Sequence, residues 1–303
     1  MEYLQAVPYD VTRHTLYTAR DLYAGFHMND AGSQRSTLDG RVYDHYLHTG
    51  KTATDIRESL ARTLHDHGMQ IALKDFFTRH DTRSCVGIMG GHALLRTSVQ
   101  FRQIVMLSKC LTEQGFIMLS GGGPGAMEAT HLGAWMAGRN EKEVDDALLT
   151  LAPAPSFRNE GWLSGALHVV ERYPQQRYVS LGIPTWLYGH EPSTPFATHI
   201  AKFFDNSIRE DAILTLPYGG IIYTPGSAGT MQEIFQDAVQ NHYVTTGMSS
   251  PMIFMGRDFW TQQMPVYPML EQLMQTSMYK NLLLTLTDDL DEIVAVLRQF
   301  RES

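Results

Sequence analysis

The segment PGSAGTMQE, residues 225 to 233, combines a turn that could hold a phosphate with an acidic residue, Glu233, one helical turn further on. It follows a strand pattern at residues 220 to 224 and opens a helix pattern near Met231. A strand that ends in a glycine-rich turn and begins a helix directs unpaired backbone N–H groups and the positive end of the helix dipole at one point. The segment therefore predicts an anion site, and the charge of Glu233 beside such a site requires its own explanation.

Two explanations of Glu233 follow from the sequence. In one, Thr230 begins the helix and Glu233 completes a capping box, TMQE, which is a local structural role. In the other, the carboxylate acts on a ligand that the turn holds. The residues of the turn that we expect to contact a phosphate are Gly226, Ser227, Ala228, Gly229 and Thr230.

A second glycine turn lies in GGGPGAMEA, residues 121 to 129, after an apolar strand pattern and before a helix pattern. Its first six residues fit the G-x-G-x-x-A dinucleotide fingerprint, but they follow the second strand of the unit, and a polar run at 141 to 146 stands where the acidic partner is needed. Glycines that only permit tight packing of strand and helix are the alternative. The residues of this turn that we expect to contact a nucleotide are Gly121, Gly122, Gly123, Gly125, Met127 and Glu128.

Two further groups of side chains could serve the same site. The pattern at 196 to 214 predicts a helix whose spacing of three and four residues places polar side chains on one face, with a solvated surface as the alternative. Those side chains are His199, Lys202, Asn206 and Arg209. In the loop at 184 to 195, Trp186 and Tyr188 could stack on a base, although packing of the loop on the core would also explain them.

The elements that must position these residues alternate between strand and helix from residue 84 onwards. This alternation predicts right-handed βαβ units and an α/β, Rossmann-like parallel sheet with helices on both faces. Ligands of such sheets bind at the carboxyl ends of the strands, where both glycine turns lie. The expected strands are 85–91, 116–120, 148–152, 178–183, 220–224, 252–255 and 282–286.

The first 80 residues predict a helical extension, followed by a catalytic domain at 81–303. Helical spacing covers residues 13–24, 53–67 and 70–79, with Asp55 or Thr54 as a start and Gly68 as a stop, while 25–50 has the composition of an irregular connection. The histidines of this region lack the spacing with cysteine or carboxylate that metal sites have, and His190 with Glu191 is an isolated pair. We therefore expect no metal and no cofactor.

Composition limits the class of partner. A net charge of −8 argues against a nucleic-acid polymer, because such proteins usually carry a basic patch. Two cysteines provide neither a disulfide framework nor a four-cysteine zinc site. No run of 18 apolar residues and no apolar leader are present, so we expect a soluble, cytoplasmic protein that does not enter membranes.

The two glycine motifs together resemble GGGxxGxM and PGGxGTxxE, the paired motifs of the LOG ("lonely guy") family, over about residues 84 to 256. The larger bacterial nucleotide-cleaving members are the more similar ones. The resemblance implies a phosphoribohydrolase that releases the free base from a nucleoside 5′-monophosphate. It also implies a homodimer, and the apolar side of the predicted helix at 196–214 is the surface that we expect to meet the partner chain, through Phe196, Ile200, Phe203, Phe204 and Ile208.

The resemblance places the catalytic glutamate at Glu233 and the catalytic arginine at Arg209. Two positions depart from the family pattern: Ser227 replaces the second glycine, and the usual arginine-lysine pair reads Arg209-Glu210. A carboxylate near C1′ would stabilise the positive charge that develops on the ribose and orient the attacking water.

Two other functions stay open. A nucleotide-binding or sensing protein would use the same pocket without turnover, and a dinucleotide oxidoreductase would use the fingerprint. The base is not specified by the sequence, since the loops at 156–162 and 184–195 that would read it have no predicted position.

Overall fold

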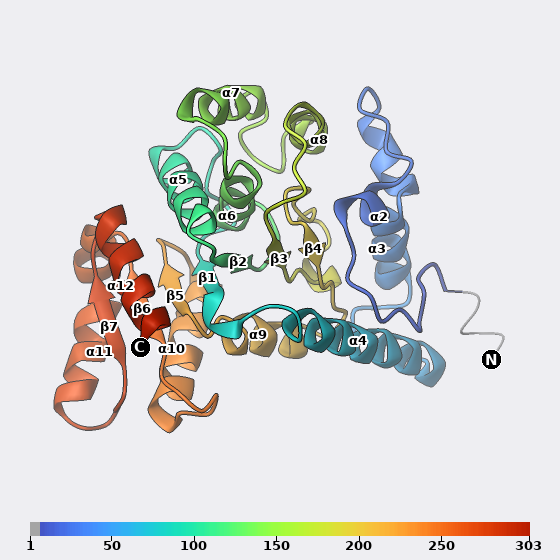
Figure 1. Ribbon diagram of the computed structural model, residues 1–303. Coiled ribbons are helices and arrows are strands. Elements are labelled where there is room, and N and C mark those ends of the chain that lie inside the picture. The colour runs from blue at the N-terminus through green and yellow to red at the C-terminus, as the bar shows by residue number, and fades with distance from the viewer. Residues whose placement is uncertain (1–6) are drawn as a thin grey trace.

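The computed structural model describes residues 7–303 and contains one seven-stranded sheet in which every neighbouring pair is parallel (Figure 1). The strand order is β4-β3-β2-β1-β5-β6-β7, so the chain moves outward from β1 in one direction and then in the other. This arrangement confirms the predicted Rossmann-like α/β fold. The strands are β1 (Cys85–Met89), β2 (Ile117–Ser120), β3 (Ser180–Gly182), β4 (His199–Ile200), β5 (Gly220–Tyr223), β6 (Pro251–Phe254) and β7 (Leu283–Leu286).

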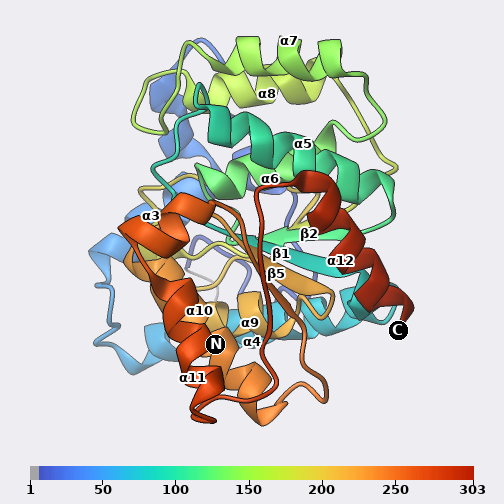
Figure 2. The ribbon, with the colours of Figure 1, turned by 90° about the vertical axis from the view of Figure 1, so that its left-hand side faces the viewer.

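Helices cover both faces of the sheet (Figure 2). Side chains of the central strands alternate between two hydrophobic clusters: in β1, Val86 and Ile88 join one cluster, while Cys85 and Met89 join the other. This alternation follows from the two-residue period of a strand that is buried on both sides. The helices of the first cluster's face are α5 (Val99–Glu113), α6 (Ala126–Trp135), α7 (Glu141–Leu151), α8 (Trp162–Arg172) and α12 (Leu290–Glu302).

The opposite face carries α9 (Asn206–Thr215), α10 (Ala228–Tyr243) and α11 (Val266–Gln275), together with α4 (Ile56–Phe77) from the start of the chain. Shorter helical turns are η2 (Thr82–Ser84), η3 (Trp186–Tyr188) and the π-helical turn η4 (Phe259–Gln263). Asp55, one of the two predicted starts, begins α4, and Asp289 begins α12; each accepts a hydrogen bond from a first-turn amide. Within residues 7–303, no helix has the length and apolar character needed to cross a membrane.

The expected strand at 148–152 is wrong, because this segment belongs to α7. Asn140 and Glu143 form a capping box at the start of that helix. The buried residues Val144, Ala147 and Leu151 then recur at helical spacing. The apolar run at 148–152 was too short to separate a strand from the end of an amphipathic helix.

The expected helix at 196–214 is also wrong over its first half. Asp205 accepts hydrogen bonds from the amides of Ser207 and Ile208, so α9 begins only at Asn206. The preceding residues form β4 and a loop with buried aromatic side chains, among them Phe203 and Phe204. Of the four polar residues that were expected on one helix face, Asn206 and Arg209 lie on α9, whereas His199 lies on β4 and Lys202 in the loop between them.

The start of the chain differs from the prediction in its helices. One helix, α4, replaces the two that were expected, and Gly68 lies inside it. A Cβ atom at Gly68 would lie 2.0 Å from the carbonyl oxygen of Arg13, so the glycine permits a close crossing of two backbones. Instead of a long first helix and an irregular connection, the chain forms α2 (Ala19–Tyr23), η1 (Ala31–Ser36) and α3 (Leu38–His48).

Residues 7–80 pack along the β4 edge and below the sheet, and they share a hydrophobic cluster with it (Figure 1). The Trp186 ring stacks on Phe204 and meets His65 of α4 edge to face. The buried ammonium of Lys202 lies 2.6 Å from the carboxylate of Asp39 in α3. Phe204 also packs against Tyr46 of α3, so at least this part of the surface that was expected to meet a partner chain is covered by the protein's own N-terminal segment.

Candidate functional site

The candidate site lies at the carboxyl ends of β1, β2 and β5, where three turns are hydrogen-bonded to one another. The amide of Gly91, after β1, donates to the carbonyl of Pro225, after β5, at 3.2 Å. The carbonyl of Gly91 accepts from the amide of Ala126, at the start of α6, at 3.1 Å. The structure thus brings both predicted glycine turns to one edge of the sheet.

Two helices begin at this edge without a side-chain cap. The N-cap of α6 is Gly125, whose φ of 70° lies in the left-handed region that favours glycine, and the N-cap of α10 is Ser227. Helix starts without capping side chains leave first-turn N–H groups for another acceptor. A Cβ atom at Gly229, in the first turn of α10, would meet nothing within 4 Å, so open space lies beside that turn.

The capping-box explanation of Glu233 is wrong. Ser227, and not Thr230, precedes α10, so Thr230 lies in the first turn and Glu233 lies further into the helix. Within residues 7–303, the Glu233 side chain makes no hydrogen bond and no ion pair. The carboxyl group is therefore not used to hold the helix end.

Burial raises the pKa of Glu233 to about 8. The positive charge of Arg209 acts in the opposite direction and lowers this pKa, while the negative charge of Glu210 raises it further. Part of the Glu233 residue nevertheless remains accessible to solvent. A carboxyl group that titrates near neutral pH can act as a general base or acid.

Arg209 lies on α9, beside α10, and is buried. Its guanidinium lies against the segments that follow β2 and β3. Its Nε atom donates to the carbonyl of Ile183 at 2.8 Å, Nη1 to the carboxylate of Glu210 at 2.8 Å, and Nη2 to the carbonyl of Gly121 at 3.5 Å. A Cβ atom on Gly121 would lie 2.0 Å from Nη2. Glycine is thus required at 121 for the guanidinium to reach the turn.

A buried histidine supports the turn after β2. His131 Nε2 lies 2.9 Å from Ser120 Oγ, which also accepts from the amide of Gly122 at 3.1 Å. His131 Nδ1 lies 3.0 Å from Ser180 Oγ in β3. Burial lowers the pKa of His131 to about 3, so the ring is neutral and can donate at one nitrogen and accept at the other. The sequence carried no signal for this residue, which lies in an apolar helix pattern.

Met127 and Glu128 occupy different surroundings. The Met127 side chain lies along the turn, with its Sδ atom 2.7 Å from the position of a Cβ on Gly121. Glu128 is fully buried, and its carboxylate accepts from Arg96 Nε at 3.0 Å. The Arg96 guanidinium also lies over the Trp162 ring. Because Glu128 is committed to this ion pair, its contribution is to hold the loop before α8 and not to contact a ligand.

The expected base contacts separate in the structure. Trp186 is fully buried, its ring is stacked on Phe204, and its Nε1 donates to Asp39, so it offers no free face to a base. This corrects the expectation for Trp186. Tyr188 is 44% exposed and retains a free surface. Lys202 is fully buried, so of the four polar residues between 199 and 209, Arg209 is the one that the structure places beside a glycine turn.

Three residues that the sequence did not connect, His92, Phe157 and Glu191, lie close together beside the turn after β1. His92 follows β1, and its Nε2 lies 3.8 Å from the Glu191 carboxylate. The His92 ring meets the Phe157 ring edge to face, with centroids 6.3 Å apart. His190 Nε2 also lies 3.8 Å from the Glu191 carboxylate, so the expected pair is present, but it is not isolated. The described residues 7–303 contain no group of three histidine, cysteine or carboxylate side chains arranged to hold a metal ion.

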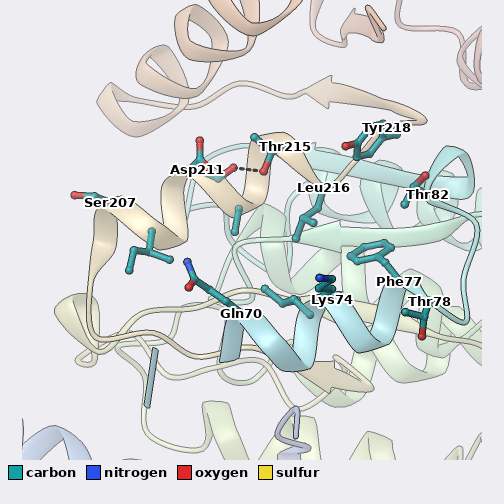
Figure 3. Close-up of a pocket in the computed structure, with 13 residues that line it drawn as sticks. Gln70, Lys74, Phe77, Thr78, Thr82, Ser207, Asp211, Thr215, Leu216 and Tyr218 are labelled. Carbon is teal, nitrogen blue, oxygen red and sulfur yellow. Dashed lines mark hydrogen bonds between the residues drawn. The ribbon is translucent and has the colours of Figure 1, made fainter. Parts of the chain in front are cut away.

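A separate groove of about 780 Å³ lies between α4 and α9 (Figure 3). Leu73, Phe77 and Leu216 supply apolar walls, and Thr215 Oγ1 donates to the carbonyl of Asp211 within it. Neither Arg209 nor Glu233 lines this groove. It is thus distinct from the edge where the glycine turns meet.

No protein-family model and no curated protein matches the sequence. Among solved structures, the chain is similar to the molybdenum cofactor binding protein of Rippkaea orientalis, with 13% identity, a TM-score of 0.44, and coverage of 71% of this chain and 95% of that one. It is similar to the molybdenum cofactor carrier protein of Chlamydomonas reinhardtii, with 15% identity, a TM-score of 0.43, and coverage of 72% and 98%. It is also similar to the structural-genomics protein TM1055, with 17% identity, a TM-score of 0.46, and coverage of 71% and 98%. At these TM-scores, the fold assignment rests on the topology of the sheet itself.

Proposed function

We propose that this chain is a LOG-like phosphoribohydrolase, which hydrolyses the N-glycosidic bond of nucleoside 5′-monophosphates to a free base and ribose 5-phosphate. The observation that carries the proposal is the placement of an unpaired carboxyl group, Glu233, and a fixed guanidinium, Arg209, at an edge where two helices begin without side-chain caps. Uncapped helix starts suit a phosphate, and a carboxyl group nearby suits chemistry on the attached sugar.

In the proposed reaction, the amides at the starts of α6 and α10 bind the 5′-phosphate and hold the ribose over Glu233. As the C1′–N bond breaks, its electron pair leaves with the base and positive charge develops on the ribose. The Glu233 carboxylate stabilises this charge and accepts a proton from the water that attacks C1′. Arg209 favours the ionised form of Glu233, because its positive charge lowers the pKa of that carboxyl.

A second candidate function is nucleotide binding without turnover. The observation that favours it is Glu210, which occupies the Nη1 donor of Arg209 and raises the pKa of Glu233. Incubation with AMP, GMP, CMP and UMP separates the two functions. The hydrolase releases ribose 5-phosphate from at least one of them, whereas a sensor shows saturable binding and no product.

We also propose that the reaction needs no metal ion, because each step above uses a protein group or water. Activity should be unchanged after dialysis against EDTA, measured as ribose 5-phosphate released per minute. Loss of activity that a divalent ion restores would contradict the proposed chemistry. Assembly as a homodimer remains a prediction, to be measured by light scattering.

A further inference from the structure

His92 is the residue beside the candidate site that has no role in the reaction described so far. It occupies the turn after the central strand β1, and a Cβ atom on Gly125 would lie 2.6 Å from the backbone carbonyl of His92. Its ring is partly exposed, so it is open to a ligand at the same edge as the two glycine turns. The residue thus lies against one of the turns that the proposed function assigns to the nucleotide.

Two residues lie beside the His92 ring. The Glu191 carboxylate lies 3.8 Å from Nε2, and its other oxygen lies 3.9 Å from the position of a Cβ on Gly123. Phe157 meets the ring edge to face from the loop before α8. The loops at 156–162 and 184–195 therefore converge on His92, although they are far apart in the sequence.

The charge of this cluster decides which part of a nucleotide it faces. A phosphate dianion beside Glu191 would be repelled, whereas the uncapped starts of α6 and α10 attract it. The Phe157 ring offers an apolar surface next to the histidine, which suits a flat heterocycle. The cluster of His92, Phe157 and Glu191 therefore matches the base end of the ligand.

We propose that His92 donates the proton that the departing base requires, and that Glu191 is a positioning residue that holds the imidazolium toward it. This inference rests on the proposed function. As the C1′–N bond breaks, its electron pair moves into the base, and a proton from His92 neutralises the base at a ring nitrogen or carbonyl oxygen. Glu233 accepts the proton from water, the remaining hydroxide adds to C1′, and both side chains exchange protons with solvent afterwards.

A leaving group that carries its own positive charge separates this role from simple binding. Nicotinamide mononucleotide and 7-methyl-GMP release a neutral base without a donated proton. His92→Gln should lower kcat for the best ordinary nucleotide by about 10²-fold or more, as expected for a lost general acid, and should change kcat for a charged-base nucleotide less than about threefold. Glu191→Gln should show the same pattern more weakly, and His168→Gln, at an exposed position of α8, is the matched control that leaves both rates unchanged.

Imidazole rescue provides the second measurement. Added imidazole should restore part of the kcat of His92→Ala with an ordinary nucleotide and should not affect the wild-type enzyme. This measurement does not depend on which base the enzyme accepts. Wild-type kcat in His92→Gln would overturn the inference, and so would equal losses for ordinary and charged bases, or a lost rate that imidazole leaves unchanged. If the wild-type enzyme releases no ribose 5-phosphate from any nucleotide, the proposed function fails first, and this role fails with it.

Discussion

The surroundings of Glu233 change the pKa of its carboxyl group in opposite directions. Burial and Glu210 raise the pKa of its carboxyl group, while Arg209 lowers it, and the balance lies at about 8. Because the proposed reaction uses the ionised carboxylate, the free enzyme should gain activity as the pH rises toward that value. Each neighbour of Glu233 should therefore shift the pH profile in a direction that follows from its charge.

The pH dependence of kcat/KM tests this balance. With a charged-base nucleotide, whose release needs no proton from His92, the wild-type profile should rise with pH, with its midpoint near the pKa of about 8. Arg209→Ala removes the charge that lowers the pKa, so the midpoint should move to higher pH, and turnover should also fall by about 10²-fold or more through loss of a positioned cation. Glu210→Gln removes a charge that raises the pKa, so its midpoint should move to lower pH. Identical midpoints in all three proteins would show that Glu233 does not control the rising limb.

At the scale of elements, the turn after β2 and helix α9 fit together through Gly121 and Arg209. In this turn, the amide of Gly122 donates to Ser120 Oγ, which is also hydrogen-bonded to His131. The Arg209 guanidinium lies against the Gly121 backbone. The carbonyl of Ile183, after β3, fixes the same guanidinium. The position of Arg209 therefore depends on the absence of a side chain at 121.

Gly121→Ala tests that dependence. A Cβ atom 2.0 Å from Arg209 Nη2 must displace the guanidinium, so we expect turnover to fall by about 10²-fold, as for removal of the cation, with the protein still folded. Gly165→Ala is the control, because a Cβ at that site of α8 meets nothing closer than 3.7 Å. Ribose 5-phosphate release and circular dichroism give both readouts. Unchanged turnover in Gly121→Ala would remove Arg209 from the reaction.

The elements around the glycine turns were predictable because the sequence shows the same order twice. An apolar strand is followed by a turn of glycine and other small residues, and the turn is followed by a helix. The failed helix at 196–214 shows the limit of such patterns. Its apolar residues suggested helical spacing, but Phe204 is buried against Tyr46 of α3 and His65 of α4, which come from a distant part of the sequence. Burial of Trp186 has the same cause, and the contact of His92 with Glu191 and Phe157 depends on loops whose positions only the tertiary structure determines.

At the scale of the whole molecule, residues 7–80 share a hydrophobic cluster with one face of the sheet and do not stand apart from it. Asp66 of α4 accepts from the amides of Phe204 and Asp205, directly before α9. Asp39 of α3 pairs with Lys202, which is buried after β4. The N-terminal segment thus fixes the start of the helix that carries Arg209.

Asp39→Ala should destabilise the protein by about 3–5 kcal/mol, because it leaves the ammonium of Lys202 buried without its partner. Asp44→Ala, at an exposed position of the same helix, should have little effect. Urea denaturation followed by circular dichroism measures both. We expect a chain lacking residues 1–80 to be unfolded or aggregated, and a stable, active truncated chain would show that this segment is a separate domain.

The most direct test of the central claim compares wild-type protein with Glu233→Gln on AMP, GMP, CMP and UMP. The amide retains the size of the carboxyl group but cannot carry its charge or accept a proton from water. We expect the wild-type protein to release ribose 5-phosphate from at least one nucleotide, and Glu233→Gln to bind that nucleotide with release slowed by about 10²-fold or more. Release by the variant at more than about a tenth of the wild-type rate would contradict the role of Glu233, because loss of a charge-stabilising group slows turnover by about 10²-fold or more. No release by the wild-type protein would contradict the proposed activity itself.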